Sequence, residues 1–179
     1  MLVKSEYASP IGKLTLVASD NALVGLWIAG QRHHGNVSGI PFGDNAILQR
    51  ASRWLDGYFA GDRPTVDFEL SPRGTAFQCA VWRALREIPY GARASYSDIA
   101  RRVGCVSARA VGGAVGRNPI SIIVPCHRVV GAHGAITGYA GGIATKEKLL
   151  NLEAWRYSRQ ITDANIPFIV SRKLASLKN

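Results

Sequence analysis

One cysteine, Cys126, stands in a setting that could support nucleophilic chemistry. It lies in the run Ile-Ile-Val-Pro-Cys-His-Arg-Val, directly after an apolar, largely β-branched segment. An isolated free cysteine is most often a small buried hydrophobe. Here Pro125 ends the apolar segment, and His127 and Arg128 follow. We therefore expect the thiol to lie where the chain leaves a core, beside groups that favour a thiolate.

A thiol becomes a strong nucleophile when a base takes its proton, and His127 is the adjacent candidate. In extended chain, neighbouring side chains point to opposite faces, so we expect a water molecule to link Cys126 to His127. The second imidazole nitrogen then needs an orienting partner, usually a carboxylate. Glu153 is the candidate, although spacing alone favours a solvated glutamate on a helix surface.

Two short helices are predicted at residues 96–103 and 107–116. Gly104 suits the left-handed residue that ends the first helix, and Ser107 suits the N-cap of the second. Such a tightly joined pair resembles a helix-turn-helix.

Small residues, among them Ala108 and Gly112, dominate one face of the second helix and allow close approach to a flat or deep partner. Arg109 is the one long cation among them. It either reaches into a DNA groove or base stack, or it is a solubilising surface charge. The residues alone leave both interpretations open.

The charge distribution favours a polyanionic partner for the second half of the chain. The 179 residues carry a formal net charge of +10. Residues 1–73 hold seven basic and seven acidic side chains, whereas residues 74–179 hold fifteen basic and five acidic ones. A polycationic domain attracts nucleic-acid phosphate, although the same charge could serve a membrane surface or solubility.

The composition, 47% apolar and 19% charged, excludes a disordered or collagen-like chain. Three cysteines without a C-x-x-C pair argue against a disulfide framework or a thiolate zinc site. No signal-peptide pattern and no membrane-spanning apolar run is present, so we expect a cytoplasmic, reducing setting.

The first part of the chain alternates strands and a helix. Strands are predicted at residues 2–7, 13–18, 23–27 and 65–70, with Asp44 as the N-cap of a helix before the last of them. Ser71-Pro72-Arg73-Gly74 is the best candidate for an interdomain joint, and the charge step falls there.

The second part reads as mostly helical. Thr75 and Gln78 have capping-box spacing, ahead of an apolar face formed by Phe77, Val81, Trp82 and Leu85. A buried strand is predicted at residues 120–124, a glycine-rich loop at 131–142 and a last helix at 145–157.

These motifs resemble the O6-alkylguanine-DNA alkyltransferases, DNA repair proteins that move an alkyl group from a damaged base to their own cysteine. The resemblance covers about residues 74–153, through Ser-Tyr-Ser-Asp-Ile-Ala, Arg-Ala-Val-Gly-Gly-Ala, Arg-Asn-Pro-Ile, Ile-Val-Pro-Cys-His-Arg-Val and Gly-Tyr-Ala-Gly-Gly.

The resemblance implies an α/β (α+β) fold class: a ribonuclease-H-like α/β domain at residues 1–73, then a mostly helical, helix-turn-helix-like DNA-binding domain at 74–155. Residues 156–179 extend beyond the resemblance with no assigned role, and the apolar patch at 168–170 slightly favours partial packing.

The resemblance also assigns roles residue by residue. Cys126 becomes the alkyl acceptor, His127 the water-linked base and Glu153 its orienting partner. Asn118 braces the turn between the recognition helix and the active-site strand, and Tyr96 donates toward guanine N3. The remaining implied positions are the stack-filling Arg109, the DNA contacts Ser107, Ala108, Gly112 and Arg117, and the base pocket of Val115, Val129, Tyr139 and Ala140.

The implied reaction flips O6-alkylguanine out of duplex DNA, with O4-alkylthymine as a further candidate lesion, and transfers the alkyl group irreversibly in one turnover. No metal and no organic cofactor are expected, and the pair His33-His34 alone is poor support for a metal site. We expect alkylated double-stranded DNA as the partner, a monomer in solution, and cooperative assembly on DNA as an open question.

Two other classes stay open. A cysteine hydrolase could use Cys126, His133 and Asn118, since those residue types suffice for acyl transfer, but it leaves the helix pair unexplained. A helix-turn-helix regulator or damage sensor would bind lesions without repairing them, which the presence of Cys126 disfavours.

Overall fold

The computed structural model describes residues 1–163 and the side chains of residues 1–154. A small sheet forms the first part of the chain. Its strands are β1 (Val3–Ser9), β2 (Gly12–Ala18), β3 (Ala22–Ile28) and β4 (Glu69–Leu70), in that spatial order. The first three pair antiparallel, and β4 joins β3 in parallel. The three predicted strands of this meander are confirmed, each within two residues of its ends.

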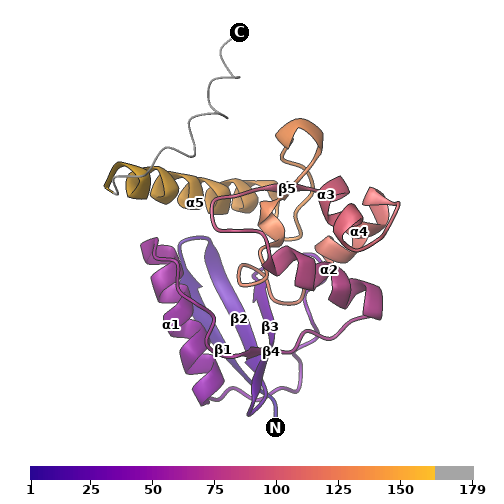
Figure 1. Ribbon diagram of the computed structural model, residues 1–179. Helices are drawn as coiled ribbons and strands as arrows, with labels where there is room; N and C mark the ends of the chain where they lie inside the picture. The colour runs from indigo at the N-terminus through magenta and orange to yellow at the C-terminus, as the bar shows by residue number, and fades with distance from the viewer. Residues whose placement is uncertain (164–179) are drawn as a thin grey trace.

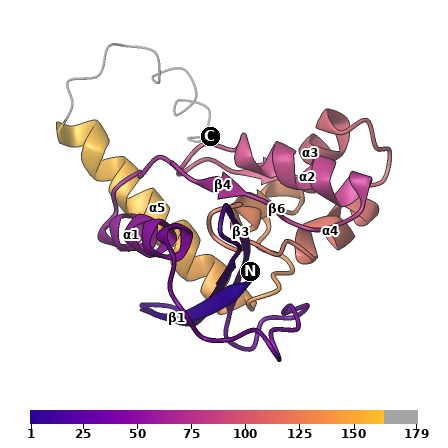
Figure 2. The same ribbon diagram turned by 90° about the horizontal axis from the view of Figure 1, so that it is seen from below.

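Helix α1 (Ala46–Ala60) packs against the first three strands (Figure 1, Figure 2). Leu14 and Leu16 of β2 and Leu55 of α1 are fully buried, and burial of each such side chain contributes about 1.5–3 kcal/mol. The N-cap is Asn45, which accepts from the Leu48 amide at 2.9 Å. The prediction of Asp44 as the cap was one residue off, because Asp44 accepts from the Gln49 side chain instead.

Only Glu69 and Leu70 of the strand predicted at residues 65–70 pair with the sheet. Side chains of α1 bind the carbonyls of the preceding segment. Trp54 Nε1 donates to the Pro64 carbonyl at 2.8 Å, and Arg50 donates to the Asp67 carbonyl. These carbonyls are therefore satisfied without a strand ladder, and residues 65–68 do not pair with the sheet.

The second part is mostly helical, as predicted. It contains α2 (Ala76–Arg86), β5 (Ala94–Ser95), α3 (Tyr96–Arg102), α4 (Ala108–Gly116), η1 (Cys126–Arg128), β6 (Val129–Val130), η2 (Ala132–Gly134) and α5 (Ile143–Asp163). The capping box of Thr75 and Gln78 is present at the start of α2. Phe77, placed on the apolar face, is instead 36% exposed.

Helices α3 and α4 form the predicted tight pair. Gly104 has φ +67°, the left-handed conformation expected of the residue that follows a helix. Ser107 accepts from the Ala110 amide at 3.1 Å, which confirms it as the N-cap of α4.

The buried strand predicted at residues 120–124 is wrong. Ile120 makes an isolated parallel bridge to Leu26 of β3, and the chain then coils into a turn in which Ile122 has φ +72°. The side chain of Asn118 stabilises this turn: Oδ1 accepts from the Ile120 amide, and Nδ2 donates to the Val124 carbonyl at 2.8 Å. Together with backbone hydrogen bonds such as that from the Val124 amide to the Ile120 carbonyl at 3.0 Å, this side chain replaces the hydrogen bonds of a strand ladder.

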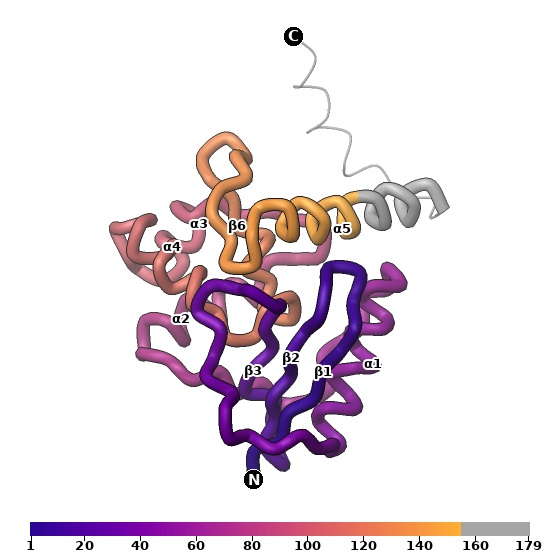
Figure 3. The backbone as a smooth tube through the Cα atoms, turned by 180° about the vertical axis from the view of Figure 1, so that it is seen from behind, coloured from indigo at the N-terminus to yellow at the C-terminus, as the bar shows by residue number. Residues whose placement is uncertain are grey.

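The last helix, α5, begins two residues before the predicted start and lies across the molecule between α1 and the helical part (Figure 1, Figure 3). It contacts η1, which carries the candidate nucleophile. No helix within residues 1–163 is long and apolar enough to cross a membrane. The apolar patch at residues 168–170 lies outside the described residues.

The capping box generates a test of local stability. Thr75→Ala removes one side of a reciprocal pair that satisfies two backbone donors, so we expect a loss of about 1 kcal/mol and a fall of about 2–4 °C in the unfolding midpoint. Thermal denaturation followed by circular dichroism measures it. Thr65→Ala, at an exposed threonine outside any helix, is the control, and equal midpoints for the two variants would contradict the role of the cap.

Candidate active site

Two short parallel strands bring distant segments to one place. β5 directly precedes Tyr96, β6 directly follows Cys126–Arg128, and their register pairs Ala94 with Val129. Cys126 and His127 belong to the 3-10 helix η1 and not to extended chain. The expectation that their side chains point to opposite faces of a strand therefore does not apply.

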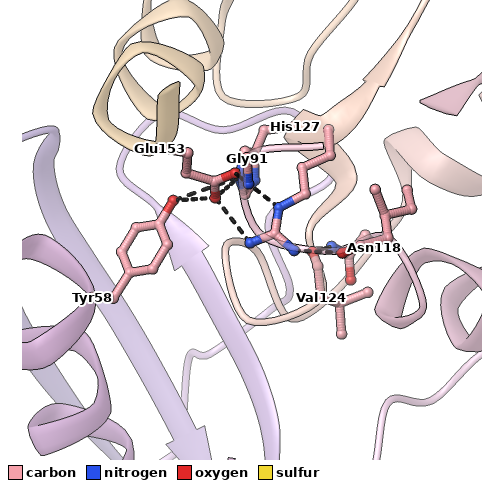
Figure 4. Close-up of polar contacts among 8 residues, drawn as sticks. Tyr58, Gly91, Asn118, Val124, His127 and Glu153 are labelled. Carbon is pink, nitrogen blue, oxygen red and sulfur yellow. Dashed lines mark hydrogen bonds and ion pairs between the residues drawn. The ribbon is translucent and has the colours of Figure 1, made fainter. Parts of the chain in front are cut away.

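Asn118 lies against the candidate nucleophile. Its Nδ2 is 3.1 Å from Cys126 Sγ, and both residues are buried, with Cys126 only 5% exposed. The same amide donates to the Val124 carbonyl (Figure 4), so it contacts both the turn at residues 120–124 and the sulfur. Asn118 was expected to brace the turn before a strand at residues 120–124; in the structure its side chain bonds the backbone of those residues, which form a turn themselves.

Burial raises the pKa of the Cys126 thiol. The hydrogen bond from Asn118, the nearby hydroxyl of Tyr139 and the charge of Lys146 each lower it, but they do not overcome burial. The resting protein therefore holds a thiol and not a thiolate. Arg128, which the sequence suggested as a thiolate-favouring neighbour, bonds Glu153 instead.

His127 and Glu153 form a buried relay. His127 Nε2 lies 2.8 Å from Glu153 Oε1, and the two side chains are 0% and 1% exposed. Burial lowers the pKa of His127, and the hydrogen bond and charge of Glu153 oppose that shift only in part. A neutral imidazole donating from Nε2 keeps Nδ1 as an acceptor, and Nδ1 is buried without a hydrogen-bond partner among the described residues.

The Glu153 carboxylate accepts hydrogen bonds from several parts of the chain (Figure 4). Arg128 donates to both oxygens at 2.9 Å, the Gly91 amide to Oε2 at 3.1 Å, and the Tyr58 hydroxyl to Oε1 at 2.8 Å. Burial raises the pKa of Glu153, but the hydrogen bonds and charges of His127 and Arg128 outweigh it and lower the pKa to about 2.

Sequence reasoning missed Lys146, which is fully buried. Its Nζ donates to the carbonyls of Val129 and Thr137, at 2.5 and 2.8 Å, and its charge acts on Cys126. The carbonyl of Val129, a residue predicted for the base pocket, therefore already accepts one hydrogen bond. A signal existed, because a lysine in the first turn of a helix is electrostatically unfavourable and implies another partner.

A cavity of about 580 Å³ reaches Tyr139, whose hydroxyl lies near the Cys126 sulfur. Its lining includes the predicted residues Tyr96, Gly112, Val115, Arg117, Tyr139 and Ala140. Cys126 and Val129 are not part of this lining; Tyr139 both lines the cavity and lies near the sulfur. Tyr96 is half-buried, and its hydroxyl is 3.4 Å from the Gly138 carbonyl.

The other predicted DNA contacts lie at the start of α4. Arg109 is exposed, and Ser107 and Ala108 are half-buried. His133, the base of the alternative hydrolase, is exposed in η2 and makes no polar contact with Cys126 or Asn118 within the described part of the chain. No cluster of three or more metal-ligating side chains occurs among those residues.

Two family models match the chain. The 6-O-methylguanine DNA methyltransferase DNA-binding domain matches residues 76–155, and the ribonuclease-like domain of the same family matches residues 2–72. A methylated-DNA–protein-cysteine methyltransferase of Methanosarcina acetivorans is 45% identical over 148 residues, covering 82% of this chain and 95% of the relative.

Solved structures agree with this result. The crystal structure of Mycobacterium tuberculosis O6-methylguanine methyltransferase superposes with a TM-score of 0.78 at 46% identity, covering 87% of this chain and 94% of that one. A structure of Mycobacterium tuberculosis OGT in complex with DNA has a TM-score of 0.77 at 47% identity, covering 84% and 92%.

A sheet domain followed by a helical domain with a buried thiol, imidazole and carboxylate defines a two-domain alkyltransferase class. The chain belongs to the 6-O-methylguanine DNA methyltransferase family. The predicted fold class is confirmed. The domain boundaries at residues 73 and 155, and the individual roles of the site residues, remain predictions.

The low pKa of Glu153 generates a pH test. A carboxyl group with a depressed folded-state pKa stabilises the fold above its unfolded pKa, near 4.5, and loses that contribution as the pH falls through about 2. Glu153→Gln removes the ionisation. The difference in unfolding free energy between wild type and variant should therefore shrink by about 3 kcal/mol between about pH 5 and about pH 2.

Urea denaturation across that range measures the difference. Glu147→Gln, at an exposed glutamate on the same helix, serves as the control. A difference between wild type and Glu153→Gln that stays constant with pH would contradict the assignment of Glu153 as a buried carboxylate.

Proposed function

We propose that this protein repairs alkylated DNA by transferring the alkyl group of O6-alkylguanine to Cys126 Sγ. The observation that carries the proposal is a buried thiol that contacts Asn118 and is followed in the chain by His127, which pairs with Glu153. A cavity of about 580 Å³ approaches this thiol through Tyr139. Family membership and relatives named for methyl transfer from DNA to a protein cysteine support the same reaction.

In the proposed reaction the thiol proton passes through a water molecule to His127 Nδ1, while Glu153 stabilises the imidazolium that forms. The thiolate attacks the alkyl carbon, and the carbon–oxygen bond breaks with its electron pair moving onto guanine O6. The released guanine takes up one proton, and Tyr96 donates toward N3 to ease its departure. The thioether has no good leaving group, so each molecule acts once.

Extrusion of the base from double-stranded DNA precedes transfer. Arg109, exposed on α4, fills the gap in the stack, and the small residues of that helix allow close approach to the groove. The remaining proposed contacts are Ser107, Ala108, Gly112 and Arg117 to DNA, and Val115, Val129, Tyr139 and Ala140 to the base. We propose a monomer in a reducing, cytoplasmic setting, where Cys126 stays unoxidised.

Methyl transfer is the direct test. Incubation with O6-methylguanine duplex DNA should add one methyl group to Cys126, seen by mass spectrometry of the intact protein and its peptides. Cys126→Ala should abolish the adduct while DNA binding survives, and Cys79→Ala should behave as wild type. Binding without any adduct would support a damage sensor, and hydrolysis of an ester with an unmodified thiol would support a hydrolase.

Arg109→Ala tests the stack-filling role. Because the arginine would fill the gap left in the duplex, and a free base leaves no such gap, we expect the transfer rate from duplex DNA to fall about tenfold while reaction with free O6-methylguanine stays unchanged. Arg53→Ala, which removes an exposed arginine on α1, controls for the lost charge. Equal losses with both substrates would refute the role.

A further inference from the structure

The hydroxyl of Tyr58 brings the first domain into the relay. Tyr58 lies on α1 and is 1% exposed. Its Oη donates to Glu153 Oε1 at 2.8 Å and is 3.5 Å from His127 Nε2, although 95 and 69 residues of sequence separate it from these partners. Figure 4 shows the ring reaching from its helix to the carboxylate.

Aromatic neighbours hold the Tyr58 ring independently of its hydroxyl. Trp54 stacks on it at 5.3 Å between ring centroids, and Phe59 and Tyr90 meet it edge-on at 5.3 and 6.0 Å. Burial and the charge of Glu153 raise the pKa of Tyr58, so the hydroxyl stays protonated and acts as a donor. Phenylalanine at this position would keep the packing and remove only the donor.

We propose that Tyr58 is a positioning residue for alkyl transfer, contributed by the N-terminal domain. Its hydroxyl fixes Glu153 Oε1 at His127 Nε2 and shares the negative charge of that oxygen. The sharing limits the basicity of the resting imidazole and keeps Nδ1 free to accept the thiol proton. The residue acts through Glu153 and does not line the cavity. The inference rests on the proposed function for the reaction that it serves.

Tyr58→Phe separates the effect of the hydroxyl from that of ring packing. With one donor fewer, the carboxylate stabilises the imidazolium more strongly, so the acidic limb of the rate–pH profile should move up by about half to one pH unit. The less firmly held carboxylate should also lower the transfer rate at pH 7.5 by about three- to tenfold. Titration of active protein with excess damaged DNA separates the rate constant from the active fraction.

Tyr7→Phe is the matched control. Tyr7 also donates to a carboxylate of the first domain, Asp56 Oδ1 at 2.7 Å, and its hydroxyl makes no hydrogen bond to Glu153 or His127. It should leave the rate and the pH profile unchanged. A Tyr58→Phe protein whose pH profile superposes on that of wild type, with losses explained by its active fraction alone, would overturn the proposal.

A second variant tests the proposal without relying on Tyr58→Phe. Site-specific 3-fluorotyrosine at position 58 keeps the ring and makes the hydroxyl a stronger donor, so the acidic limb should move down. An unchanged or upward limb would contradict charge sharing.

Reaction of Cys126 with iodoacetamide, mapped by peptide mass spectrometry, gives a readout without DNA. If the acidic limb of the iodoacetamide rate–pH profile shifts as predicted in a protein that transfers no methyl group, the proposed function is refuted and the role of Tyr58 stands. Absence of the shifts in both assays would refute that role.

Discussion

The buried charge of Glu153 is the constraint on which the structure depends. A carboxylate that is 1% exposed is costly unless its lone pairs are satisfied. It is satisfied here by the Arg128 guanidinium, the His127 imidazole, the Gly91 amide and the Tyr58 hydroxyl. These donors come from α1, the segment before β5, and η1, whereas the carboxylate comes from α5. The interaction that orients the base therefore also joins the two domains.

At Cys126, unlike at Glu153, burial has a larger effect on the pKa than the polar neighbours have. Burial keeps Cys126 protonated, and the polar groups around it reduce that effect without reversing it. A resting thiol beside a neutral imidazole reacts more slowly with adventitious electrophiles than a thiolate does, which suits a residue that is used only once in the proposed reaction. In the proposed reaction the thiolate forms when the proton moves to His127, and Asn118 and Lys146 are placed to stabilise the new negative charge.

Much of the fold could be predicted from the sequence, because helix caps and turns depend on residue types only a few positions apart. Thr75, Gly104 and Ser107 each take the predicted conformation. Long-range hydrogen bonds were not predictable. The segment at residues 120–124 has the composition of a buried strand, but Asn118 folds it into a turn. Nothing in the sequence indicates that the hydroxyl of Tyr58 meets a carboxylate 95 residues away.

The protonation state of His127 in the resting protein tests the central claim most directly. Nitrogen-15 NMR of histidine-labelled protein near neutral pH, assigned with His127→Gln, reports which ring nitrogen carries the proton. We predict a neutral imidazole protonated at Nε2, with Nδ1 free as the acceptor. A doubly protonated ring, or a proton on Nδ1, would contradict a relay in which His127 takes the proton of Cys126.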